Sequence, residues 1–344
     1  MGLKTYVARR ILLLIPVLIG VTSLIFLISM CFTPEQRAAL YVTDRRQMRD
    51  LKGVAERYHL YDPINVQYVN WLKKLLQGDL GWSSYSHMPV TRCIIEYVPA
   101  TLELALYAGP ITIFLGIWLG KECAVHKDRL VDHISRVFAI IGWSLPTFWS
   151  AILFLSVFYG GLRWIPPGRL GEGASWYVSH STDFIRYTNI NTIDALLNWK
   201  PWIFLDALKH LVLPVTNLVI VSCALIMRIM RSSMLEVLGK GYITMARAKG
   251  LDETDVINKH AQRNALIPVT TISGVMLAGM MCGMVITETV FNYMGIGYWA
   301  ANAATHLDIA GILGFALIVG VVYVTANLIV DIMYAYLDPR IRLG

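Results

Sequence analysis

The residues best placed to do chemistry lie in one short basic stretch between two long apolar runs. A charged side chain costs several kcal/mol in hydrocarbon, so this stretch cannot cross a membrane as the runs around it can. We expect it to lie at a membrane face, where a partner protein can reach it. The candidate contact residues are Thr244, Met245, Ala246, Arg247, Ala248, Lys249, Gly250, Leu251 and Asp252.

The residue types in this stretch suit binding rather than catalysis. Arg247 and Lys249 can donate charge-assisted hydrogen bonds to carboxylates on a partner. Small residues such as Ala246 and Gly250 would let a partner surface approach the backbone, and Asp252 is placed to cap a following helix. The alternative is an ordinary cytoplasmic loop whose cations only set the orientation of the chain in the membrane.

Motifs for catalysis or nucleotide binding are missing from the sequence. The stretch Gly116–Lys121 has only three residues between its glycines, whereas the phosphate-binding loop G-x-x-x-x-G-K-[ST] has four. The stretch Gly142–Pro146 does not match G-x-S-x-G, and no H-E-x-x-H occurs. We therefore predict that this chain is not an enzyme, holds no cofactor or metal, and takes its energy from another subunit.

Six long runs without Asp, Glu, Lys or Arg must position the basic stretch. They are Ile11–Pro34, Leu104–Gly120, Val137–Leu162, Leu211–Met227, Ala265–Thr287 and Ile309–Val330. A helix needs about 20 mainly apolar residues, and at least about 17, to cross a ~30 Å hydrocarbon core. Every run reaches that minimum. The sequence therefore predicts an all-α integral membrane protein with six transmembrane helices.

The distribution of charge predicts the orientation of these helices. The N-terminus, the loops 121–136 and 228–264 and the C-terminal tail together hold 16 of the 30 Lys and Arg residues but only 8 of the 23 acids. Short cytoplasmic loops carry an excess of Lys and Arg, whereas long segments such as 35–103 count little. Both termini and the loop 228–264 are therefore expected in the cytoplasm. The basic charge reflects topology and does not indicate nucleic-acid binding.

We expect a single transmembrane domain over residues 1–344, with extracytoplasmic segments at about 35–103, 163–206 and 288–308. The segment 163–206 is rich in Trp and Tyr, which suits either ligand stacking or the membrane interface. Apolar residues at helical spacing in the first segment predict short amphipathic helices on the outer membrane surface. One of these helices would present Val66, Val69, Leu72, Leu75 and Leu76.

Small residues within the runs are interpreted as packing positions. The pairs Gly116/Gly120 and Gly279/Gly283 put small residues on one helix face, which favours close helix contact. The five cysteines show neither metal-binding spacing nor a disulfide framework. They are Cys31, Cys93, Cys123, Cys223 and Cys282. The first two could meet outside, but small apolar filler is the preferred interpretation for all five.

Several polar residues lie near the ends or inside the runs: Glu103, His210, Glu288, Asn327 and Asp331. An ionisable residue inside a span is by default a functional candidate. For Glu103, His210 and Glu288 we expect a solvated interface position and prefer structural hydrogen bonding to substrate contact. Asp331 is expected to pair with an arginine or to cap packing.

Ordered motifs run through nearly the whole chain. They are Arg9-Arg10, Asp62-Pro63, Gln67-Tyr68, Gly78–Ser83, Pro99–Leu104, Ser144–Trp149, His210–Pro214, Arg231–Leu238, Tyr242–Leu251 and Asp338–Arg342. Taken in order, they resemble the permease subunits of dipeptide and oligopeptide ABC importers. Two positions depart from the wider importer family. Thr244 stands in place of the acid of a Glu-Ala-Ala motif, and Met294 replaces the proline of a Pro-Gly-x-Gly turn.

The resemblance implies a function and a set of partners. The stretch Thr244–Asp252 would form a short coupling helix that docks into an ATP-hydrolysing subunit. The partners would be a second, homologous but different permease, two ATPase subunits, an extracytoplasmic substrate-binding protein and the lipid of the cell membrane. Di- or oligopeptides are the expected cargo, with oligosaccharides or a nickel complex as alternatives. A stand-alone secondary transporter or channel predicts repeated halves or a charged intramembrane pathway, and neither is evident.

Overall fold

The computed structural model describes residues 3–42, 44 and 46–337, so the closing motif Asp338–Arg342 lies outside the described residues. The described chain is built almost entirely of helices. The longest are α1 (Leu3–Ser29), α5 (Val90–Val125), α10 (Pro201–Leu238), α13 (Gln262–Met281) and α16 (Ile309–Leu337). Each of them is long and apolar enough to cross a membrane. For α13 the candidate span includes the helical residues before it and runs over Glu253–Met281. The architecture therefore fits the predicted all-α membrane protein.

The third expected span, Val137–Leu162, is not one straight helix. It is divided between α6 (Leu130–Ser144) and α7 (Thr147–Phe154), which continues as a π-helix over Leu155–Gly161, and the two parts meet at 100°. Pro146 accounts for the break, because proline lacks a backbone N–H and keeps the residue before it extended. The described residues thus contain five candidate spans, or six if the bent pair crosses as one.

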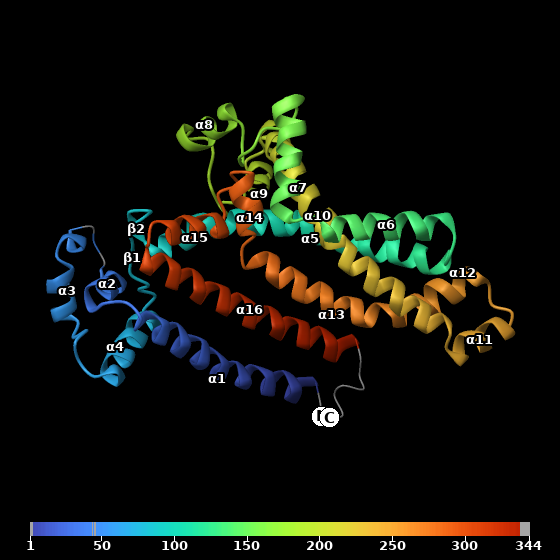
Figure 1. The fold of residues 1–344 in the computed structure, drawn as a ribbon, viewed down its shortest axis with the longest axis horizontal. Helices are drawn as coiled ribbons and strands as arrows, with labels where there is room; N and C mark the ends of the chain where they lie inside the picture. Colours follow the sequence, from blue (N-terminus) through green and yellow to red (C-terminus); the bar gives the residue numbers. More distant parts are fainter. Residues whose placement is uncertain (1–2, 43, 45, 338–344) are drawn as a thin grey trace.

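The short elements connect and cover these long helices. The short helices are α2 (Pro34–Ala38), α3 (Leu51–Arg57), α4 (Ile64–Leu76), α8 (Glu172–His180), α9 (Asn191–Leu197), α11 (Gly241–Ala248), α12 (Glu253–Asp255), α14 (Val285–Val290) and α15 (Ile296–Thr305). Strands β1 (Trp82–Ser83) and β2 (Met88–Pro89) form a small antiparallel hairpin. In Figure 1, α11 and α12 lie at one end of the long axis, beside the connection between α5 and α6. The helices α2–α4 and the hairpin lie at the opposite end.

α10 is the central helix of the bundle, and α5, α6 and α13 all pack against it. Gly116 and Gly120 of α5 allow a close approach. A Cβ added at these positions would lie 2.5 Å from Ile226 Cγ2 and 2.6 Å from Met230 Cβ, respectively. The predicted packing role of this glycine pair is therefore confirmed. In the second pair, a Cβ at Gly279 would meet nothing within 4 Å, whereas one at Gly283 would lie 3.1 Å from the backbone nitrogen of Gly297.

The outer amphipathic helices are present, and α4 leaves part of its predicted apolar face exposed on the protein. Its buried residues are Gln67 and Trp71, whereas Val69 and Leu76 of the expected apolar face are exposed. A contact from a distant part of the chain accounts for this orientation, because Arg37 Nη1 of α2 donates to Gln67 Oε1 at 2.5 Å. Contact of the exposed apolar face with the membrane surface stays a prediction.

The cysteines are free thiols in different surroundings. Cys93, Cys123 and Cys223 are buried, Cys282 is half-buried and Cys31 is exposed. The interpretation as apolar filler is therefore confirmed for the three buried residues and is wrong for Cys31. Because Cys31 and Cys93 are both free, the alternative of an outer disulfide does not hold.

Candidate functional site

The predicted contact residues lie on α11 and in the turn that follows it, at the tip of the molecule (Figure 1). Gly250 ends this helix with a φ of +78°, a backbone conformation that favours glycine. Its N–H donates to the carbonyl of Arg247 at 2.9 Å. The N–H of Leu251 donates to the carbonyl of Ala246 at 3.4 Å. Together these bonds form a Schellman cap, so the backbone itself requires a glycine here.

One face of α11 attaches the helix to the rest of the protein. Ile243 and Ala246, three residues apart, are both buried. They belong to a hydrophobic cluster that includes Met234 of α10 and Val256 and Ala261 of the π-helix before α13. The methyl group of Ala246 therefore contributes to the attachment of α11 and not to a surface that a partner could approach.

Exposed apolar side chains lie on the rest of α11 and in the turn that follows it. The exposed fractions are 46% for Tyr242, 62% for Met245 and 42% for Leu251. We call these three residues the apolar tip. Other predicted contact residues around it are also exposed: Thr244, Arg247, Ala248, Lys249, Gly250 and Asp252. Exposed apolar side chains framed by polar ones are typical of a surface that another protein covers.

Arg247 is held within the chain by Glu253. Its Nη2 donates to Glu253 Oε1 at 2.5 Å and its Nε to Glu253 Oε2 at 3.0 Å. This pair connects α11 to α12 across the intervening turn. The sequence suggested that Arg247 would bind a carboxylate on a partner, but in the structure its guanidinium is already paired with Glu253. Asp252 lies at the start of α12, yet its side chain makes no capping hydrogen bond. The expectation of an Asp252 side-chain cap is therefore wrong.

A buried ion pair fixes α6 to α10 near the same end of the molecule. Arg231 Nε and Nη2 of α10 donate to the two carboxylate oxygens of Asp132 on α6, each at 2.8 Å. The Asp132 side chain is completely buried, and it also accepts from the backbone N–H of Asp128 at 3.1 Å. Movement of the end of α10 must therefore displace α6 as well.

Glu103 of α5 is a fully buried carboxylate with four hydrogen-bond donors. Oε1 accepts from the N–H and the hydroxyl of Thr192 at 2.8 and 3.0 Å, and Oε2 accepts from Tyr293 at 2.7 Å and Arg169 at 2.9 Å. Burial raises the pKa of Tyr293 well above its ordinary value, so its hydroxyl stays protonated and donates. The structural role predicted for Glu103 is confirmed, but the solvated position is wrong.

Glu288 and His210 are buried in the same way. Glu288 accepts from the Thr101 hydroxyl at 2.7 Å and from the backbone N–H of Tyr298 at 2.8 Å. His210 Nδ1 lies 2.8 Å from the carbonyl oxygen of Asp206, one turn earlier in α10. Both residues thus have the hydrogen-bonding role that was predicted, in buried rather than solvated positions.

The two remaining polar candidates are both on α16. Asn327 of α16 is half-buried. The side chain of Asp331 lies outside the part of the chain that the structure describes. Its pairing with an arginine stays a prediction.

Comparison with known families identifies the chain. The family model described as "Binding-protein-dependent transport system inner membrane component" matches residues 112–343. The chain belongs to this family. It is therefore a multi-pass permease component of the inner membrane, as the sequence predicted.

Its relatives in the family are similar over nearly their whole length. The chain is 37% identical to the "Probable D,D-dipeptide transport system permease protein DdpB" of Escherichia coli, over 96% of this chain and 95% of the relative. It is 36% identical to the "Dipeptide transport system permease protein DppB" of Alkalihalophilus pseudofirmus, over 98% and 99%. It is 33% identical to the "Oligopeptide transport system permease protein AppB" of Bacillus subtilis, over 99% and 100%.

Sequence reasoning missed three features of this permease's candidate coupling site. Its list of contact residues began at Thr244 and so left out Tyr242, which is part of the apolar tip, and Ile243, which anchors α11. The spacing of Ile243 and Ala246 was a detectable signal for a buried helix face. The pair Asp132–Arg231 joins residues 99 positions apart, and no local pattern could have shown it.

Proposed function

We propose that this chain is one half of an ABC importer that takes up di- or oligopeptides. Its relatives carry the names of dipeptide, D,D-dipeptide and oligopeptide transport systems, and they align over nearly the full chain. As a single transmembrane domain, the chain would line the pathway with a second, different permease. Two ATPase subunits would bind on the cytoplasmic side and a substrate-binding protein on the outer side.

The proposed topology has six spans, with the bent pair α6–α7 as the third and both termini in the cytoplasm. The arrangement of the helices supports it. α11, α12 and the α5–α6 connection share one end of the bundle (Figure 1), and these connections carry the excess of Lys and Arg expected of cytoplasmic loops. The hairpin and α2–α4 then lie outside.

The observation that carries the coupling role is the division of α11 into two faces. Its exposed face carries the apolar tip, which suits docking into a groove on an ATPase. Its buried face joins α11 to α10 and to the start of α13 through Ile243 and Ala246. A displacement of the tip would therefore act on the bundle's central helix directly, and on α6 through the pair Asp132–Arg231.

Co-purification of the ATPases with the membrane subunits tests the coupling role. Met245 is the most exposed residue of the apolar tip, so Met245→Glu should weaken ATPase binding without changing the fold. Burying a whole Met side chain contributes about 1.5–3 kcal/mol. With 62% of Met245 exposed, about 1–2 kcal/mol is available on docking, or roughly a 5- to 25-fold change in affinity.

The matched control is Met245→Leu, which keeps an apolar side chain of similar volume and should retain the ATPases. Both variants should show the same thermal stability as the unmodified protein. Equal ATPase retention by Met245→Glu and Met245→Leu, at equal expression, would exclude docking through the apolar tip.

Uptake by the reconstituted importer tests the cargo. Radiolabelled dialanine should accumulate in proteoliposomes when ATP is supplied on the ATPase side, and maltose and nickel should not. ATP-dependent uptake of maltose or nickel without dialanine would replace the peptide assignment. Uptake by this chain alone, without ATPases, would overturn the importer assignment altogether.

A further inference from the structure

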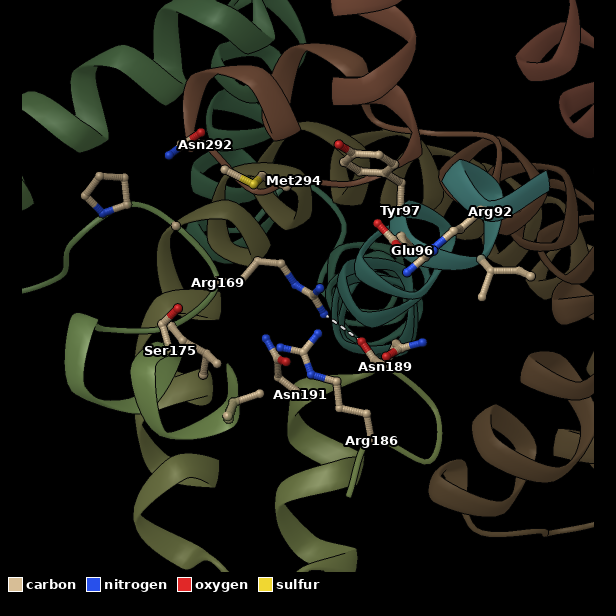
Figure 2. A pocket seen from close by; sticks show the side chains of 15 residues that line it. Arg92, Glu96, Tyr97, Arg169, Ser175, Arg186, Asn189, Asn191, Asn292 and Met294 are labelled. Atoms are coloured by element: carbon tan, nitrogen blue, oxygen red, sulfur yellow. Dashed lines mark hydrogen bonds and ion pairs between the residues drawn. The ribbon is translucent and has the colours of Figure 1, made fainter. Parts of the chain in front are cut away.

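A cavity of about 810 Å³ opens beside the outer end of α5, where the 167–170 loop and the segment 186–191 approach residues 292–294 (Figure 2). Small-molecule sites in proteins usually enclose about 300–1,000 Å³, so this cavity is large enough for a short peptide. It lies at the end of α5 that is farther from α11 (Figure 1). Under the proposed topology it therefore faces the side from which cargo arrives.

The cavity lining is rich in positive charge and in amide groups. Three arginines line it: Arg92, Arg169 and Arg186. Three asparagines line it as well: Asn189, Asn191 and Asn292. Arg92 is neutralised by the lining residue Glu96, whose Oε1 lies 3.0 Å from Arg92 Nε. The charges of the other two arginines determine what the cavity can bind.

Arg169 is fixed in place but incompletely hydrogen-bonded. Its Nη2 donates to Glu103 Oε2 at 2.9 Å and to the carbonyl of Asn189 at 3.0 Å, and its guanidinium lies 5.6 Å from the ring centre of Tyr293. Its Nε is buried and has no acceptor. A buried donor without a partner carries a substantial free-energy cost. Arg169 is therefore held rigidly in the cavity wall, while its buried Nε is closed to a ligand.

Arg186 supplies a positive charge that nothing in the described chain balances. It is exposed, and no acidic side chain of the described residues pairs with it. In Figure 2 the guanidinium groups of Arg169 and Arg186 both extend into the middle of the cavity. Since Glu103 neutralises Arg169 and Glu96 neutralises Arg92, the three arginines leave the cavity with one net positive charge, that of Arg186. One charge with several N–H donors matches a carboxylate, which guanidinium groups bind through paired hydrogen bonds.

We propose that this cavity is a subsite for the C-terminal carboxylate of the peptide cargo. Arg186 supplies the charge, Arg169 contributes a guanidinium group held in a fixed orientation, and the asparagine amides are available to the peptide's main-chain groups. The permease itself, and not only its binding protein, would then select peptides with a free C-terminus. This inference rests on the proposed peptide cargo, but it concerns binding to the isolated chain and needs no ATPase.

Saturation-transfer NMR on the full chain in nanodiscs tests the subsite at the millimolar concentrations expected of weak cargo binding. The probes are dialanine, dialanine amide and acetate. Dialanine should receive saturation and the amide should not, because the amide lacks the negative charge. Arg186→Gln should weaken dialanine binding about 10- to 100-fold, the range for a lost charge-assisted hydrogen bond. Arg163→Gln is the matched control, because Arg163 is exposed on the same connection but does not line the cavity.

Three results would overturn the subsite. They are equal binding of dialanine and its amide, unchanged binding by Arg186→Gln, and acetate binding as tight as that of dialanine. None of them bears on ATP-dependent uptake, so the importer assignment would stand. If uptake fails in the reconstituted importer while the isolated chain still prefers dialanine to its amide, the subsite stands and the importer assignment falls.

Discussion

Removing the charge of Glu103 should reveal how firmly the outer connection 163–206 is fixed to α5. The carboxylate holds Arg169 and Thr192 of that connection and also Tyr293, through four hydrogen bonds of 2.7–3.0 Å. The substitution Glu103→Gln keeps the shape of the side chain and removes its charge. The Arg169 guanidinium would then remain in a largely buried site without a counter-charge.

The magnitude follows from the burial of the pair. Removing one partner of a buried ion pair costs about 3–5 kcal/mol. The Glu103 side chain is fully buried, but Arg169 retains 19% exposure, so we expect the lower end, about 3 kcal/mol. At roughly 2–4 °C per kcal/mol, the midpoint of thermal unfolding should fall by about 6–12 °C.

The assay is thermal unfolding of the purified chain in detergent, monitored by fluorescence-detected size-exclusion chromatography. Arg169→Met should also destabilise, and the double variant should lose less than the sum of the two single variants, because no unpaired charge remains. Glu96→Gln is the control. It breaks an exposed pair with Arg92, which should cost less than about 1 kcal/mol. Additive losses, or a Glu103→Gln shift no larger than the control, would refute the reasoning.

Three further predictions concern the bundle. Asp132→Asn should lower the unfolding midpoint by about 6–12 °C, because it leaves Arg231 without its counter-charge; an unchanged midpoint would show that the pair does not hold α6. Gly116→Leu should cost about 1–3 kcal/mol by overpacking the contact between α5 and α10, measured by the same assay. Gly279→Leu, in open space, is its control, and equal shifts for the two would contradict the packing argument. In right-side-out vesicles, a membrane-impermeant maleimide should label Cys31 and not the buried cysteines; labelling only after permeabilisation would reverse the topology.

The positions of the spans could be predicted because hydrophobicity is a property of each segment alone. The bend at Pro146 could not be predicted in this way, although the sequence shows the proline. Pro16, Pro110 and Pro214 lie inside helices that continue past them. Whether a proline breaks a membrane helix depends on whether neighbours satisfy the freed backbone groups, and those neighbours come from other parts of the chain.

In the sites too, features set by local sequence could be predicted, whereas contacts between distant parts of the chain could not. The spacing of charged and small residues indicated where α11 lies, because that pattern is local. The partners of Glu103 lie between 66 and 190 positions away in the sequence. The acceptor that orients α4, Gln67, is 30 positions from Arg37. Periodicity within a single helix contains no information about contacts of this kind, so the buried carboxylates were wrongly placed in water.

The pair Arg247–Glu253 gives the tip of the molecule a mechanical property. It bridges the turn around Gly250, the one place where α11 and α12 could pivot against each other. A flexible turn at this position would absorb part of any displacement of α11. Under the proposed coupling role, this pair would limit bending of the turn, so that a displacement of α11 would carry α12 with it.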